Sequence, residues 1–160
     1  MKDLIKSFGY AFQGIFRTIR TERNMRIHLV VSAYMYGYLL IYDFFDVSRT
    51  GFAVLFLANA IVMMAEIINT AVENVVDLVE QKKNVYCKVA KDAAAGAVLV
   101  GALFSVAVGI ALLAQPKAFR AMFAYYRDNP VWIAVLAVSL VLSFIFIFKF
   151  GAARKKGNDQ

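Results

Sequence analysis

Residues 93–114 read AAAGAVLVGALFSVAVGIALLA, a run that contains no charged side chain. A helix needs about 20 apolar residues to cross the hydrocarbon core of a bilayer, and this run supplies them. Residues 131–148 form a second charge-free run. Residues 51–79 are apolar as far as Met64, and residues 27–42 are apolar apart from several tyrosines. The sequence therefore predicts an all-α integral membrane protein with three core transmembrane helices and a fourth, C-terminal one.

The composition supports a membrane protein over a soluble one. Hydrophobic residues make up 61% of the chain, against roughly 45–50% in soluble domains. The net charge of +7 could indicate nucleic-acid binding, but the basic residues lie beside the apolar runs, so the anionic cytoplasmic leaflet is the better partner. Cys87 is the only cysteine, which excludes an intramolecular disulfide. The first residues lack the pattern of a cleavable signal peptide.

The N-terminal segment, residues 2–23, has the pattern of an amphipathic helix. Seven apolar side chains fall within about 120° of arc at 100° per residue: Leu4, Ile5, Phe8, Phe12, Ile15, Phe16 and Ile19. Basic and polar side chains cluster on the opposite face. Such a helix is expected to lie in the membrane interface, although packing against another protein element is an alternative.

The distribution of basic residues predicts the orientation in the membrane. All of the 18 Lys and Arg residues lie in the N-terminal segment, in the connection around residue 85 or in the C-terminal tail, except Arg49, Lys117, Arg120 and Arg127. Cytoplasmic segments carry the excess of positive charge. We therefore expect both termini and residue 85 to be cytoplasmic. The chain divides into a membrane domain, residues 1–115, and residues 116–160, which hold a connection, the extra transmembrane helix and a basic tail.

The second half of the run at residues 51–79 carries a stripe of polar residues on one helix face. Glu66, Asn69, Glu73 and Asp77 follow one another at spacings of 3, 4 and 4 residues, which place them within about 80° of arc on one helix face. Acidic residues in or near a membrane are costly, so a functional role is the first hypothesis. Asp77 alone could equally be part of a plain solvated helix end.

The depth of these residues predicts a site at the inner membrane surface. Glu66 lies about 22 Å along a helix that enters near Gly51, whereas Glu73 and Asp77 lie past a hydrocarbon core of about 30 Å. Three further charged residues are expected at the same level: Glu22, Lys91 and Asp92. A half-buried acid, a cluster of acids able to bind a metal and a lysine therefore converge there.

Phosphoryl transfer to a membrane alcohol would use groups of these kinds. Mg²⁺ binds hard oxygen ligands, commonly one or two carboxylates with substrate phosphates and water. The transferred phosphoryl group needs positive charge nearby, and the attacking hydroxyl needs a positioned base. The glycine-rich lysine motif of P-loop enzymes is missing from the sequence. His28 is the only histidine, so a zinc site of the His/Cys type is not supported.

Two motifs resemble those of the prokaryotic diacylglycerol kinase family. They are E-x-x-N-T-A-x-E-x-x-x-D at residues 66–77 and AKDAAAGAVL at residues 90–99. The segments SFGYAFQGIF, residues 7–16, and TERNMRIH, residues 21–28, also resemble the family. The resemblance covers residues 5–114. The chain departs from the family pattern by its fourth predicted crossing, because the family core ends after three.

The resemblance implies a homotrimer of three-crossing subunits, with active sites between subunits that use MgATP. By position, Glu66 matches the proposed general base, and Glu22 and Glu73 match the glutamates that hold the metal. The residues that match nucleotide or phosphate contacts are Tyr10, Glu22, Asn69, Glu73, Lys91 and Asp92. Asp77 matches the last acid of the motif.

The predicted function is therefore an ATP-dependent lipid kinase of the bacterial cytoplasmic membrane. The form TERNMRIH favours the branch that acts on undecaprenol, and diacylglycerol is the alternative substrate. Two other classes stay open on the residues: a small ion-coupled transporter or channel subunit that uses Glu66 as a cation site, and a non-catalytic membrane scaffold. Transporter sites tend to lie near the bilayer midplane, whereas these acids crowd one surface.

Overall fold

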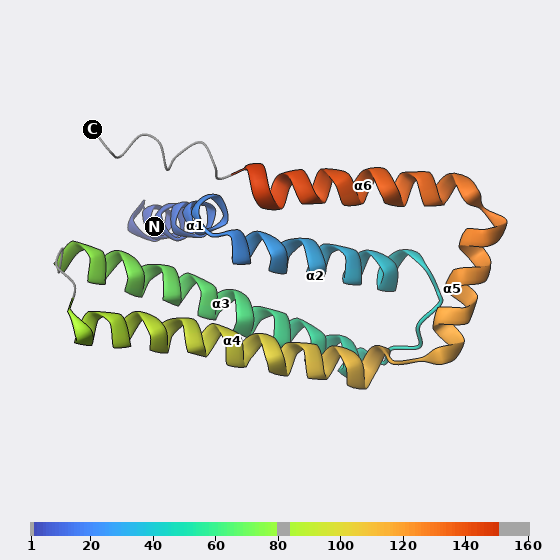
Figure 1. The fold of residues 1–160 in the computed structure, drawn as a ribbon, viewed down its shortest axis with the longest axis horizontal. Coiled ribbons are helices and arrows are strands. Elements are labelled where there is room, and N and C mark those ends of the chain that lie inside the picture. The colour runs from blue at the N-terminus through green and yellow to red at the C-terminus, as the bar shows by residue number, and fades with distance from the viewer. Residues whose placement is uncertain (1, 80–83, 151–160) are drawn as a thin grey trace.

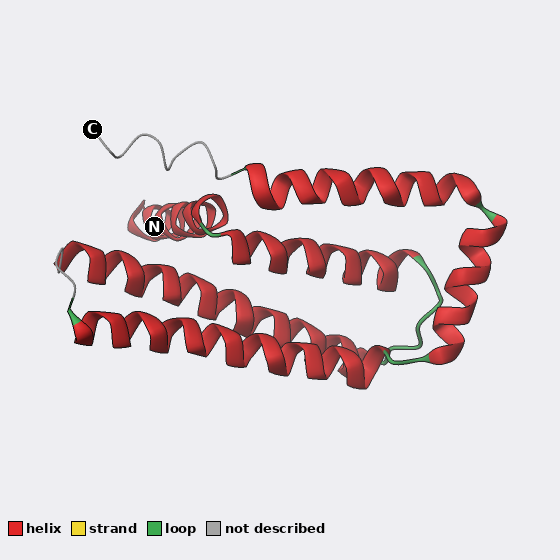
Figure 2. Cartoon of the chain, in the orientation of Figure 1, coloured by secondary structure: helices red, strands yellow, loops and turns green. Residues whose placement is uncertain are grey.

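The computed structural model describes residues 2–79 and 84–150, which form six helices (Figure 1). In chain order these are α1 (Lys2–Thr21), α2 (Arg23–Ile41), α3 (Arg49–Val79), α4 (Val85–Leu113), α5 (Pro116–Asp128) and α6 (Pro130–Lys149). Figure 2 shows short connections between them and no strand in the described part of the chain. The predicted all-α class is therefore confirmed.

The antiparallel pair α3 and α4 forms the largest contact between helices (Figure 1). Leu55 and Val62 of α3 and Val98 of α4 are buried. A methyl group added to Gly101 would lie 3.7 Å from the Val62 side chain, so α4 comes close to α3 there. Gly96 is not a point of close approach, because a methyl group added there would meet nothing within 4 Å.

Helix α2 lies between α3 and α6 (Figure 1). Its contact with α3 includes a polar cluster. The Ser32 hydroxyl donates to the Asn59 side-chain oxygen at 3.1 Å, and Asn59 Nδ2 donates to the Tyr36 hydroxyl at 2.9 Å. Because interhelical hydrogen bonds satisfy polar groups where water is scarce, this cluster fixes how α2 is rotated against α3.

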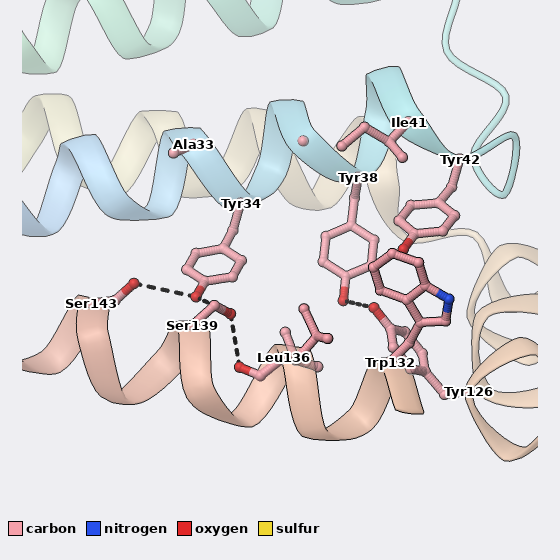
Figure 3. A pocket seen from close by; sticks show the side chains of 12 residues that line it. Ala33, Tyr34, Tyr38, Ile41, Tyr42, Tyr126, Trp132, Leu136, Ser139 and Ser143 are labelled. Atoms are coloured by element: carbon pink, nitrogen blue, oxygen red, sulfur yellow. Dashed lines mark hydrogen bonds between the residues drawn. The ribbon is translucent and has the colours of Figure 1, made fainter. Parts of the chain in front are cut away.

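Tyrosines on the other face of α2 bind α6 and α5 (Figure 3). The Tyr34 hydroxyl donates to Ser139 Oγ at 2.8 Å, and the Tyr38 and Tyr126 hydroxyls lie 2.6 Å apart. Burial and the hydrogen bond with Tyr38 raise the pKa of Tyr126 to about 12. A cavity of about 390 Å³ lies between these helices, with Trp132 in its wall. Helices α5 and α6 are therefore attached to α2 through specific hydrogen bonds.

Arg26 joins three helices near the start of α2, and only 4% of its surface is exposed. Its guanidinium group donates to the carbonyl oxygens of Ile19 and Arg20, both at 2.9 Å, and of Ile147 at 3.0 Å. These carbonyls belong to the last turns of α1 and α6, where helical carbonyls lack partners within their own helix. One buried cation thus caps two helix ends.

Different helices lie at the two ends of the molecule (Figure 1). Helix α1, the end of α3, the start of α4 and the end of α6 lie together, and we call this the α1 end. Helix α5 and the connection from α2 to α3 lie at the opposite, α5 end. Figure 1 views α1 nearly along its axis, so α1 runs across the other helices. Two of the basic segments predicted to be cytoplasmic, helix α1 and the start of α4, lie at the α1 end.

Among the described residues, three helices are long and apolar enough to cross a membrane: α3, α4 and α6. Helix α2, which contains the predicted crossing 27–42, is not among them. It begins with Arg23 and carries Arg26, His28 and three tyrosines, which lower its hydropathy. A multi-pass membrane protein is therefore supported, and the total of four crossings stays a prediction.

Helix α5 replaces part of the connection predicted between residues 114 and 131. Pro116 occupies its first turn, where the missing N–H of proline costs no hydrogen bond. Its apolar side chains fall on one face, from Ala118 to Tyr126, and Ala118 is buried. The segment carries charges throughout and is short, so hydropathy alone did not reveal it.

Candidate active site

Glu66, the first residue of the polar stripe on α3, is buried, with 1% of its surface exposed. It lines a cavity of about 290 Å³ together with residues of α2 and α4. The contribution of α4 to this cavity is purely apolar: Ala95, Val98, Leu99 and Ala102. The structure thus places a carboxyl group in a mostly apolar hollow between three helices, an environment suited to a general base.

Two buried oxygens in this region have no hydrogen-bond partner among the described residues: Glu66 Oε1 and Asn69 Oδ1. They lie one helical turn apart, and both residues line the same cavity. A buried polar atom without a partner costs about 1–3 kcal/mol. Two such acceptors in one cavity therefore indicate a place for a hydroxyl group or another donor from a ligand.

The stripe continues as the sequence predicts. Asn69 Nδ2 donates to Glu73 Oε1 at 3.1 Å, because residues four apart face each other on a helix. Further along, Lys91 of α4 forms an ion pair and a hydrogen bond with Asp77 of α3. The predicted convergence of a lysine with the acids is confirmed for Asp77, at the α1 end of the helix pair.

The carboxylates of Glu22 and Glu73 are the predicted metal ligands. Both lie within electrostatic range of Glu66. Glu22 occupies the extended residue between α1 and α2, so it reaches the site from a different element than Glu73. The described residues do not gather three or more metal-binding side chains in one place. A pair of carboxylates still fits Mg²⁺, which takes further ligands from phosphates and water.

The remaining predicted residues lie away from the Glu66 cavity. Tyr10 lies on α1 with 69% of its surface exposed, and Asp92 is exposed near the start of α4. Neither residue lines the cavity. One copy of the chain therefore brings Glu66 together with Asn69, and leaves Tyr10 and Asp92 exposed outside the cavity.

The structure adds His28 and Asn24, two residues of α2 that sequence reasoning did not place at the site. His28 Nε2 lies 3.7 Å from Glu66 Oε1, and both residues line the cavity. Their spacing in the sequence indicated only that Asn24 and His28 lie on the same face of a helix, because residues four apart share a face. That spacing did not show that this face of α2 turns towards Glu66.

The family model for prokaryotic diacylglycerol kinases matches residues 9–113. The chain belongs to the prokaryotic diacylglycerol kinase family. This match ends with α4, so α5 and α6 lie outside the shared region. The family predicted from the motifs at residues 66–77 and 90–99 is confirmed.

Two relatives of this chain are named as lipid kinases. A diacylglycerol kinase of Synechocystis is 40% identical over 115 residues, which are 71% of this chain and 64% of that protein. An undecaprenol kinase of Bacillus subtilis is 39% identical over 119 residues, which are 73% of this chain and 92% of that protein. No solved structure matches the chain. Both names support the predicted class of activity, a lipid kinase.

Proposed function

We propose that this protein is an ATP-dependent kinase that phosphorylates the hydroxyl group of a membrane lipid, with undecaprenol as the substrate. The observation that carries the proposal is Glu66, a carboxyl group with 1% exposure that lines a hollow and has an unpartnered oxygen. A base for a lipid alcohol has to be reached from the bilayer, and Glu66 lies on a helix apolar enough to span it.

In this proposal Glu66 accepts the proton of the lipid hydroxyl. The lipid oxygen then attacks the γ-phosphorus of ATP, the bond between that phosphorus and the β–γ bridging oxygen breaks, and ADP leaves. The products are the lipid phosphate, ADP and a proton. The low polarity of the cavity helps, because a carboxylate surrounded by apolar groups is a stronger proton acceptor than one in water.

Glu22 and Glu73 would hold Mg²⁺ against the phosphates of ATP. The ion would neutralise negative charge that the phosphates carry during transfer. Asn69, Lys91 and Asp92 would contact the nucleotide or its phosphates, and Tyr10 would lie against the adenosine. Asp77 would set the position of Lys91, with which it forms an ion pair.

A homotrimer would complete the site. In one chain, Tyr10 and Asp92 face away from the Glu66 cavity. A second copy packed against this surface would bring its own Tyr10 to the Glu66 cavity of its neighbour. The exposed alanines beside Gly96 on α4 offer a smooth surface for such packing.

We place the protein in the bacterial cytoplasmic membrane, with α1 in the inner interface and four crossings by α2, α3, α4 and α6. The α1 end would face the cytoplasm, where ATP is found. The transverse direction of α1 supports this placement (Figure 1). So do the basic residues of α1 and of the start of α4.

Undecaprenol is favoured over diacylglycerol by two observations. The segment TERNMRIH at residues 21–28 has the form of the undecaprenol branch. The matched region also covers 92% of the Bacillus undecaprenol kinase but 64% of the Synechocystis diacylglycerol kinase. The two identities are nearly equal, so an assay must decide between the lipids.

The deciding experiment offers undecaprenol and diacylglycerol side by side to the purified protein with γ-labelled ATP. We expect label in undecaprenyl phosphate, and a loss of about 10²–10⁴-fold in turnover for Glu66→Gln, which keeps the shape but removes the base. Turnover close to that of the unchanged protein in this variant would contradict the role of Glu66. Label only in phosphatidic acid would overturn the choice of lipid.

A second measurement tests the metal ligands. Glu73→Ala should weaken Mg²⁺-dependent binding of ATP as well as turnover, because half of the proposed carboxylate pair is lost. The matched control is Asp3→Ala, which removes an exposed acid of α1. If both variants bind ATP with unchanged affinity and metal dependence, Glu73 is not a ligand.

A further inference from the structure

The buried oxygen of Glu66 faces a group that the proposed mechanism leaves unused. His28 Nε2 lies 3.7 Å from Glu66 Oε1, and this oxygen has no hydrogen bond within the described chain. Among the ion pairs of the described residues, His28 is the partner of Glu66. A single turn or tilt of either side chain would bring the two atoms to the 2.7–3.2 Å of a hydrogen bond.

The surroundings of this pair leave few competing interactions. The wall from α4 is apolar, and the polar neighbours on the cavity surface are Asn24 of α2 and Asn69 of α3. The side chain of Asn69 is already a donor to Glu73. The buried cation Arg26, two residues before His28, is bound to carbonyl oxygens of α1 and α6. The Asn24 side chain hydrogen-bonds the Glu66 carboxyl group, but Glu66 Oε1 is left without a partner among the described residues. The imidazole N–H of His28 is placed to reach that oxygen.

A carboxylate base works only when its orientation is fixed, because proton transfer requires hydrogen-bond contact with the reacting hydroxyl. Hydrogen bonds at such sites are often long before the substrate binds, and they tighten in the complex. The 3.7 Å separation of His28 from Glu66 fits that state. The side chain of His28 is 25% exposed, so it retains room to move towards Glu66.

We propose that His28 is a positioning residue of the kinase site, which donates its Nε2–H to Glu66 Oε1 and leaves the second carboxylate oxygen to accept the proton of the lipid. This inference rests on the proposed function. The position of His28 supports a role in orienting Glu66, because His28 lies two residues after Arg26, whose hydrogen bonds hold this end of α2 in place. The hydrogen bonds of Asn59 with Ser32 and Tyr36 fix the rotation of α2 relative to α3.

The test compares three substitutions of His28. His28→Gln retains an N–H donor at nearly the position of Nε2, His28→Leu fills a similar space without a donor, and His28→Asn has a donor that is too short to reach Glu66. We expect Gln to retain most of the turnover, and Leu and Asn to lower kcat by about 10- to 100-fold, which corresponds to one hydrogen bond to a charged group. The KM for ATP should not change, because His28 does not contact the nucleotide in this scheme.

A double-mutant cycle separates positioning from a purely structural effect. In the Glu66→Gln background, replacing His28 by Leu should cost little further turnover, because His28 acts through Glu66. Equal losses in both backgrounds would overturn the proposal, and so would a Leu or Asn variant as active as the unchanged protein. If the Leu variant does not assemble, the comparison of Gln with Asn decides alone. Lack of lipid phosphorylation by the unchanged protein would instead contradict the proposed function.

Discussion

Replacing Arg26 by Met removes the cation that joins α1, α2 and α6 while keeping a long, flexible apolar side chain. The guanidinium group makes three hydrogen bonds to the carbonyl oxygens of Ile19, Arg20 and Ile147, at 2.9–3.0 Å. Because only 4% of the surface of Arg26 is exposed, water competes little for these hydrogen bonds. The substitution should therefore loosen the attachment of α6 and of α1 to α2.

The size of the effect follows from the number of bonds. In soluble proteins, a hydrogen bond to a charged group contributes about 1.5–3 kcal/mol, but interhelical bonds in membrane proteins average only about 0.6 kcal/mol. Three bonds at the lower figure amount to about 2 kcal/mol. The freed carbonyls lie in the last turns of their helices and can bind interfacial water, which keeps the loss near this value. Burial of Met in place of a charge also offsets part of it.

The assay is unfolding of the protein in mixed micelles as the fraction of sodium dodecyl sulfate increases. Trp132 is the only tryptophan, and it lines the cavity between α2 and α6, so its fluorescence reports on α6. Arg20→Met is the matched control, because the Arg20 side chain is exposed on α1 and the same charge is lost. A free energy of unfolding for Arg26→Met within about 0.5 kcal/mol of this control would refute the reasoning, since exposed charges contribute little.

Three further predictions follow from the contacts of α6, the charge distribution and the family boundary. A double-mutant cycle of Tyr34→Phe and Ser139→Ala should give a coupling of about 0.6–1.7 kcal/mol in the same unfolding assay, and no coupling would mean that their 2.8 Å contact does not stabilise the α6 interface. A membrane-impermeant thiol reagent added outside cells should label Ala121→Cys on α5 but not Cys87, and the reverse pattern would contradict the proposed orientation. A chain that stops at Gln115 should keep its lipid preference and most of its activity per assembled protein, because the family match ends before this point; an assembled but inactive truncation would show that α6 shapes the site.

The helices of the membrane domain were largely predictable because their signals are local. Residues 51–79 were expected as one long helix, and α3 spans Arg49–Val79. Helix α4 begins at Val85, earlier than the apolar run that starts at residue 93. Asn84 caps it by accepting a hydrogen bond from the backbone N–H of Tyr86. Hydropathy located the part of α4 suited to the membrane, but not the polar turns that extend it.

Part of the candidate site was predictable for the same reason. The helical repeat alone places Asn69 beside Glu73, and the structure has that hydrogen bond. Gly96 and Gly101 are both small residues of α4, but Gly101 makes the close approach to α3. Composition showed which residues could allow close contact, but not which face of α4 would meet α3.

The sequence by itself determined the membrane class, the polar stripe on one face of α3 and the grouping of basic residues towards one side, since hydropathy, helical period and charge are properties of neighbouring residues. Only the tertiary structure decided which side chains meet across helices. It brought His28 to Glu66, Lys91 to Asp77, and Arg26 to the ends of α1 and α6. Such contacts depend on the crossing angle and rotation of whole helices, which are set by packing over many residues far apart in the chain.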